Sequence, residues 1–214
     1  MKKVKLSEIT IERIKNKDFK DFIPEFYELE KVIENNPWHN NDKVSNHVIS
    51  VLVELKQLFE RLHNRVKTYL DKKIETYSRK ELLFLAALFH DIGKKETYKK
   101  ENDITTCPEH EEGGALKVKA ILTRFDLSES ERGFVTEIVR SHGVIHEILN
   151  YSEENPGKKI KRFREENPDI FLEIIVLAIA DMLASQLKEN KPDEFKFRMD
   201  SLNKLLNNYS QTKL

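Results

Sequence analysis

An imidazole and a carboxylate stand side by side at the end of an apolar stretch of the chain. The stretch Leu82–Phe89 contains only leucine, phenylalanine and alanine, and His90 and Asp91 follow it directly. A carboxylate that faces a hydrophobic core loses its hydration and requires a partner, which can be a metal ion. We therefore interpret this doublet as part of a cation-binding or catalytic site.

Similar side chains recur at inward positions of other apolar segments. His47, His142 and Asp181 each share a predicted helix face with apolar residues spaced three or four positions apart. His110 lies in the first turn of another predicted helix. A single inward histidine is usually an ordinary core residue, but imidazoles and carboxylates from several segments indicate that they converge. Because such groups together satisfy a divalent cation, the pattern predicts a metal centre.

Long helices must position these side chains. Six glycines and six prolines in 214 residues leave long uninterrupted stretches, and no strand alternation of useful length is seen. Helices are predicted over residues 24–36, 42–73, 78–91, 108–125, 128–141, 169–188 and 192–208. Capping boxes are predicted at two helix starts, with the pairs Ser78/Glu81 and Ser128/Glu131. The predicted fold class is all-α, a single globular helical bundle.

The composition excludes several classes of protein. Lysine and arginine together number 37, as do aspartate and glutamate, so no strongly basic nucleic-acid-binding surface is expected over the whole chain. Cys107 is the only cysteine, which excludes an intrachain disulfide framework and a thiolate metal cage. Neither a signal peptide nor a long apolar run is seen, so no membrane contact is expected and the predicted location is cytoplasmic.

The ordered set of histidines and aspartates resembles the HD-domain metal-dependent phosphohydrolase superfamily. The order is His47, the doublet His90 and Asp91 in ALFHDIGK, His110, His142, and Asp181 in LAIADMLAS. The part of the chain that looks most like the HD region of bacterial CCA-adding tRNA nucleotidyltransferases and their stand-alone relatives is HEEGGALKVKAILTRFDLSESERGFVTEIVRSHG. The resemblance spans about residues 38–188. Because only about 37 residues precede it, the resemblance implies the hydrolase activity and not CCA addition.

The resemblance also implies a domain layout and a set of metal ligands. The expected layout is an N-terminal helical arm over 1–37, the HD domain over 38–190, and a C-terminal helix over 191–214 that packs on the same domain. The family ligands for one metal correspond to His47, His90, Asp91 and Asp181. Relatives with two intermediate histidines, here His110 and His142, hold a second metal, and Asp91 then bridges the two. One or two divalent transition ions are expected, among Fe, Mn, Ni, Co and Zn, and no organic cofactor.

The predicted reaction is hydrolysis of a phosphoester or phosphoanhydride of a nucleotide-like small molecule by a metal-activated water. Asp91 is expected to steer the water, and Lys94 to contact the phosphate, although a solvated lysine near a helix end is the alternative. One alternative function is an RNA- or tRNA-binding HD module with a structural metal, with the basic run at 157–167 as a candidate but not favoured surface. Another is an oxygenase, as in relatives with a dinuclear iron centre. Oligomeric state is open.

Several further residues near these motifs receive structural interpretations. His39, His63 and His146 lie in polar or charged surroundings and are predicted to be surface residues. Trp38 is a candidate for stacking on a base or for ordinary packing near the site entrance. Cys107 has no visible catalytic partner and is predicted to be structural.

Overall fold

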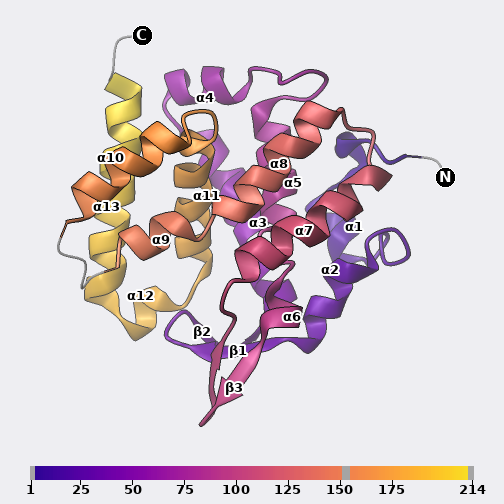
Figure 1. The fold of residues 1–214 in the computed structure, drawn as a ribbon, viewed down its shortest axis with the longest axis horizontal. Helices are drawn as coiled ribbons and strands as arrows, with labels where there is room; N and C mark the ends of the chain where they lie inside the picture. Colours follow the sequence, from indigo (N-terminus) through magenta and orange to yellow (C-terminus); the bar gives the residue numbers. More distant parts are fainter. Residues whose placement is uncertain (1–2, 151–154, 212–214) are drawn as a thin grey trace.

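Three helices with strongly apolar sequences lie at the centre of the molecule. In a computed structural model, which describes residues 3–150 and 155–211, these are α3 (Val44–Arg61), α5 (Arg79–Phe89) and α11 (Phe171–Ala184) (Figure 1). Every residue of α11 from Phe171 to Met182 is buried, because the helix is apolar on most of its circumference and other helices pack around it. The predicted all-α class is confirmed, since only short strand pairs interrupt the helices.

Other helices surround this centre. They are α1 (Ile11–Lys15), α2 (Pro24–Glu28), α4 (Asn64–Leu70), α6 (Lys94–Thr97), α7 (His110–Ile121), α8 (Glu129–Ser141), α9 (Val144–Ile148), α10 (Pro156–Glu166), α12 (Leu187–Asn190) and α13 (Pro192–Gln211). Helix α8 packs between α7 and α5, and α13 packs along α11. Buried residues from the N-terminal segment, such as Phe26, and from α13, such as Leu202, join the same hydrophobic cluster as the central helices. The domain boundaries after residues 37 and 190 stay a prediction.

Two β-hairpins replace structure that the sequence predicts as helix or loop. The predicted helix over 24–36 is wrong in its second half, where β1 (Ile33–Asn36) pairs antiparallel with β2 (His39–Lys43). Extended backbone is favoured here because the residue before a proline avoids the helical region, and Pro37 follows β1. The segment between the predicted helices over 78–91 and 108–125, to which the sequence assigns no helix, contains β3 (Lys99–Glu101) and β4 (Ile104–Thr106).

The two hairpins lie against each other at one end of the molecule (Figure 1). The turn of the second hairpin places Asn102 and Asp103 at φ angles of 47° and 64°, which asparagine and aspartate tolerate better than most residues. The backbone N–H of Asn35 donates to Thr105 Oγ1 at 2.7 Å, which ties β1 to β4. These contacts fix β1 beside the predicted site residues.

The predicted long helix over 42–73 is broken. Helix α3 ends at Arg61 and α4 starts at Asn64, with Leu62 in an extended conformation between them. The exposed His63 caps α4, because its Nδ1 accepts a hydrogen bond from the backbone N–H of Arg65 at 3.2 Å. The break allows the chain to turn while Leu62 stays buried.

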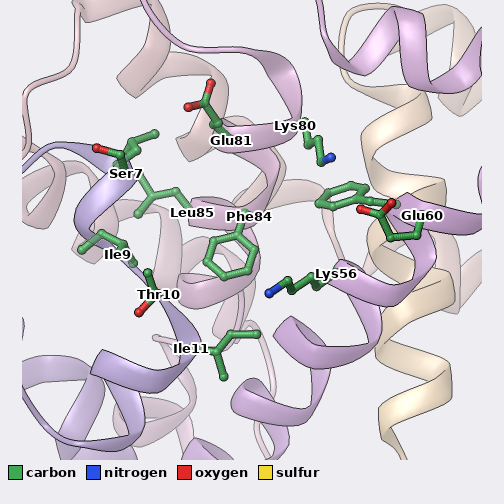
Figure 2. A pocket seen from close by; sticks show the side chains of 12 residues that line it. Ser7, Ile9, Thr10, Ile11, Lys56, Glu60, Lys80, Glu81, Phe84 and Leu85 are labelled. Atoms are coloured by element: carbon green, nitrogen blue, oxygen red, sulfur yellow. The ribbon is translucent and has the colours of Figure 1, made fainter.

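A hollow of about 320 Å³ lies where the N-terminal segment packs over α3 and α5. Figure 2 shows Phe84 at its centre, flanked by Ile11 and the two lysines Lys56 and Lys80. The hollow contains none of the predicted site residues. Within the described ranges, no helix has the length and apolar character that crossing a membrane requires.

Candidate metal centre

The carboxylate of Asp91 lies at the meeting point of several imidazoles. Asp91 is in the turn after α5 and is 2% exposed. Its Oδ2 lies 3.3 Å from His90 Nε2, and its Oδ1 lies 3.3 Å from His110 Nε2 and 3.8 Å from His142 Nε2. The structure therefore brings together four of the predicted metal ligands, from the end of α5, the start of α7 and the end of α8.

Gly93 permits this close approach. A Cβ atom at position 93 would collide with the main-chain oxygen of His110 and would lie 2.6 Å from the nitrogen of Gly114. Only glycine therefore allows the turn that carries Asp91 to pack directly on the first turn of α7. This backbone contact sets the distance between Asp91 and His110.

Three imidazoles are oriented by the same local hydrogen bond. Nδ1 lies next to the main-chain carbonyl three residues earlier, at 2.8 Å for His90, 2.9 Å for His110 and 2.8 Å for His142. Because a carbonyl can only accept, each Nδ1 carries the hydrogen, and the neutral ring presents an unprotonated Nε2 on its opposite side. All three Nε2 atoms point toward Asp91.

The result is a cluster of acceptors with few donors. His110 Nε2 and His142 Nε2 lie 3.3 Å apart, and His90 Nε2 is buried without a hydrogen-bond partner. Buried acceptors that face one another and a carboxylate are unfavourable unless a cation lies among them. The donor set of nitrogen and oxygen suits a divalent transition ion, so these residues fit the implied metal. Glu111, whose ligand atom lies within 4.8 Å of those of His110 and His142, could add a carboxylate.

The remaining predicted ligands form the adjoining wall of the site. His47, on α3, has its Nε2 2.8 Å from Asp181 Oδ1 and 3.9 Å from Asp91 Oδ2. Asp181 lies on α11, and ligand atoms of His47, His90 and Asp181 fall within 4.8 Å of one another. Nε2 of His146 lies 3.1 Å from the other oxygen, Oδ2, of Asp181. The prediction that His146 is a surface residue is wrong, because Gly143 begins a turn that returns the chain to the site.

Burial and neighbouring charges set the pKa values in the cluster. Burial would raise the pKa of Asp91, but the positive charge of His90 when that ring is protonated, together with the charge of Lys94, outweighs burial and holds the pKa well below its usual range. Burial also opposes the charge of Asp181, yet hydrogen bonds from His146 and His47 keep that pKa well below its usual range. Burial lowers the pKa of His142. Both aspartates are therefore ionised at neutral pH, as metal binding requires.

Comparison with known families agrees with this geometry. A family model described as HD domain matches residues 44–186, about two thirds of the chain. The chain belongs to the HD domain family. The chain is 22% identical over 169 residues to a bifunctional uridylyltransferase/uridylyl-removing enzyme of Chromobacterium violaceum, covering 78% of this chain and 18% of that protein. It is 25% identical over 166 residues to the enzyme of the same description from Azotobacter vinelandii, covering 77% and 17%.

The chain thus spans less than a fifth of the length of these curated relatives. The similarity is therefore to a part of each enzyme and does not carry over its whole activity. Because these two relatives are uridylyltransferases, the closer resemblance of this HD domain to CCA-adding enzymes stays a prediction.

A buried, ion-paired lysine lies between the candidate metal centre and the first hairpin. Lys94 is 8% exposed, and its Nζ lies 2.8 Å from Glu34 Oε2 and 3.0 Å from Asp91 Oδ2. Glu34 comes from β1 and is 4% exposed. His39 Nε2 lies 3.5 Å from Glu34 Oε2, and the His39 side chain is buried, so its predicted surface position is also wrong. Sequence reasoning missed Glu34 because its inward orientation results from the pairing of β1 with β2, which the sequence did not predict.

The centre opens into a cleft of about 470 Å³. Trp38 lines the cleft, where its ring meets His146 edge-on at 5.0 Å and lies under the guanidinium of Arg198 at 5.3 Å. Cys107 also lines it, and burial raises the pKa of this thiol to about 12. A thiol with that pKa is protonated at neutral pH, which agrees with a structural role.

Proposed function

We propose that this chain is a metal-dependent phosphohydrolase, a phosphodiesterase or phosphatase that cleaves a phosphoester or phosphoanhydride of a nucleotide-like substrate. The observation that carries the proposal is the set of three Nε2 atoms aimed at the Asp91 carboxylate on the floor of a ligand-sized cleft. Membership of the HD domain family supports it. The names of the two relatives include uridylyl removal, which is cleavage of a phosphoester bond.

The proposed metal ligands are the six residues that converge. They are His47, His90, Asp91, His110, His142 and Asp181. One or two ions of Fe, Mn, Ni, Co or Zn would supply Lewis acidity, which acidifies a water and offsets phosphate charge. Of these residues, Asp91 is proposed to accept a proton of the attacking water on its carboxylate.

Other side chains prepare the site for phosphate. Lys94 is proposed to bind a phosphate oxygen when the substrate displaces part of its ion pair with Glu34. His146 holds Asp181 in place through the bond between Nε2 and Oδ2. The cleft volume of about 470 Å³ suits a mononucleotide-sized ligand, and Trp38 offers an aromatic surface for a base. A cytoplasmic location remains part of the proposal.

The decisive experiment combines metal analysis with a substrate panel. Purified protein is loaded with each candidate metal in turn, its metal content is measured, and phosphomonoesters, phosphodiesters and nucleoside polyphosphates are tested. Asp91→Asn is expected to lower kcat/KM by at least a thousandfold, whereas the exposed Asp71→Asn is expected to leave it unchanged. Equal activity of Asp91→Asn and the wild type would show that the proposed centre is not the catalyst.

The alternative is an RNA-binding HD module with a structural metal. Helix α10 exposes the basic residues Lys158, Lys161 and Arg162, but Lys161 and Arg162 pair with acidic residues one turn later. This pairing weakens the electrostatic attraction for a phosphate backbone. Inactivity across the panel together with salt-sensitive binding of tRNA would favour this alternative.

A further inference from the structure

The basic side chains that line the cleft already have carboxylate partners. Within the described residues, these are Lys94, Lys191 and Arg198. Lys94 pairs with both Glu34 and Asp91, at 2.8 Å and 3.0 Å. Arg198 Nη2 lies 2.7 Å from Glu194, and Lys191 Nζ lies 3.6 Å from the same carboxylate. A phosphate that enters the cleft therefore meets no uncompensated ammonium or guanidinium group among them.

Carboxylates outnumber these cations. The described acidic residues that line the cleft are Glu34, Asp91, Glu111, Glu147, Asp181 and Glu194. Two divalent ions would slightly overcompensate this excess of negative charge, whereas a single ion would not remove it. In either case the cleft has little capacity to neutralise a substrate with more than one negative charge.

Glu34 is the carboxylate best placed to act on the charge of the substrate. Asp91 and Asp181 belong to the proposed metal ligands, and Glu194 is shared by two basic side chains. Among the residues that the structure describes, Glu34 has one ammonium partner, Lys94, and shares it with Asp91, so one positive charge serves two buried carboxylates. A like charge brought beside a buried, undercompensated carboxylate is disfavoured.

We infer, on the basis of the proposed function, that the cleft selects phosphodiesters over phosphomonoesters and that Glu34 is the residue that determines this selectivity. A phosphodiester carries one negative charge at neutral pH. A phosphomonoester is mainly a dianion there, because its second proton leaves near pH 6. The second negative charge of the monoester is repelled by Glu34. The diester has no second charge and avoids this repulsion.

The same charge also favours release of the product. Hydrolysis adds one water: its oxygen joins phosphorus, the bond from phosphorus to one alcohol oxygen breaks, and one proton of the water ends on the departing alcohol. The phosphorus product is a monoester, which gains a second negative charge when its other acidic proton is lost to solvent. Glu34 repels this product more strongly than the substrate, so product inhibition is weak in the wild type.

The test compares two substrates with the same leaving group. Metal-loaded wild type, Glu34→Gln and Glu28→Gln are assayed at pH 8 with bis(p-nitrophenyl) phosphate and p-nitrophenyl phosphate. Glu28 is the matched control, because it also pairs with a lysine, Lys95, at 2.6 Å but is 43% exposed and lies outside the cleft. Glu34→Gln is expected to lower the diester-to-monoester ratio of kcat/KM at least tenfold, and Glu28→Gln is expected to leave it unchanged.

A binding measurement decides the same question without turnover. Trp38 is the only tryptophan and lines the cleft, so its fluorescence reports occupancy. Glu34→Gln is expected to tighten the binding of inorganic phosphate at least tenfold and to leave that of dimethyl phosphate within about threefold. Unchanged phosphate affinity, or an unchanged substrate ratio, would overturn the role of Glu34. Hydrolysis of either substrate would still uphold the proposed function in that case. Hydrolysis of neither would count against the proposed function, and the binding arm would still decide the role of Glu34.

Discussion

The burial of His39 predicts a measurable dependence of stability on pH. Burial, together with the nearby charges of His47 and Lys94, lowers the pKa of His39 to about 4, although Glu34 and Asp91 act in the opposite direction. In the unfolded chain the pKa is about 6.5. Well above pH 6.5 the ring is neutral in both states and contributes no pH dependence. As the pH falls from 6.5 toward 4, the unfolded chain binds a proton that the folded chain does not bind, so folding becomes less favourable.

The size of the effect follows from the difference between the two pKa values. The value of about 4 in the folded protein lies about 2.5 pH units below the unfolded value. At roughly 1.4 kcal/mol per unit, His39 lowers the free energy of unfolding by about 3 kcal/mol between pH 6.5 and pH 4. This is a substantial part of the stability of an average domain, which is about 5–15 kcal/mol.

The assay is urea unfolding of the metal-free protein at several pH values from 7 to 4, followed by circular dichroism. His39→Gln cannot take up the proton, so its stability is expected to fall less steeply than that of the wild type. As a control, Asn203→Gln at an exposed position of α13 removes no ionisable group and is expected to keep the wild-type slope. Identical slopes for His39→Gln and the wild type would refute the reasoning, because they would mean that protonation of His39 costs the folded state nothing.

Three further predictions concern the metal site and the packing around it. His146→Ala removes the hydrogen bond to Asp181 and is expected to weaken metal binding about 10- to 100-fold in a chelator competition; wild-type affinity would contradict it. Gly93→Ala is expected to lower stability by about 1–3 kcal/mol in thermal melts, whereas Gly113→Ala, whose Cβ meets nothing within 4 Å, is expected to raise it by about 0.5–1 kcal/mol. Arg79→Met leaves the buried carboxylate of Glu173 unpaired and is expected to lower the free energy of unfolding in urea by about 3–5 kcal/mol. Adding Glu173→Leu to this variant is expected to restore much of that loss, and additive losses in the double variant would count against the pair.

Local chemistry made the helix starts predictable from sequence. The capping box at Ser78 is present, with the side chain of Glu81 accepting from the N–H of Ser78 at 2.8 Å and Ser78 Oγ accepting from the N–H of Glu81 at 3.2 Å. The second predicted box, at Ser128, is also present. Its partner Glu131 additionally accepts the backbone N–H groups of Thr76 and Tyr77, each at 2.7 Å. That second role joins segments more than fifty positions apart, so no local pattern could indicate it.

The convergence of the site was predictable to the extent that its residues lie on periodic helices. His47 and Asp181 follow the apolar steps of α3 and α11, and both face the centre. Glu34 and His39 could not be found in this way, because their inward orientation results from the pairing of β1 with β2 across Pro37. In the sequence these residues stand among asparagines and charged side chains, whose polarity indicates an exposed turn.

The ends of α5 and α8 explain why an apolar helix terminates in a histidine. The last carbonyls of a helix lack intrahelical donors, and the Nδ1 hydrogens of His90 and His142 satisfy one carbonyl at each end. The same bond fixes the tautomer, which leaves Nε2 unprotonated on the opposite side of the ring. A carboxylate has only acceptors and an ammonium group only donors, so neither could close the helix end and present a ligand nitrogen at once. The buried helix therefore determines, through its own backbone, which ring nitrogen faces the candidate metal centre, and only the distances between the histidines depend on how α5, α7 and α8 pack.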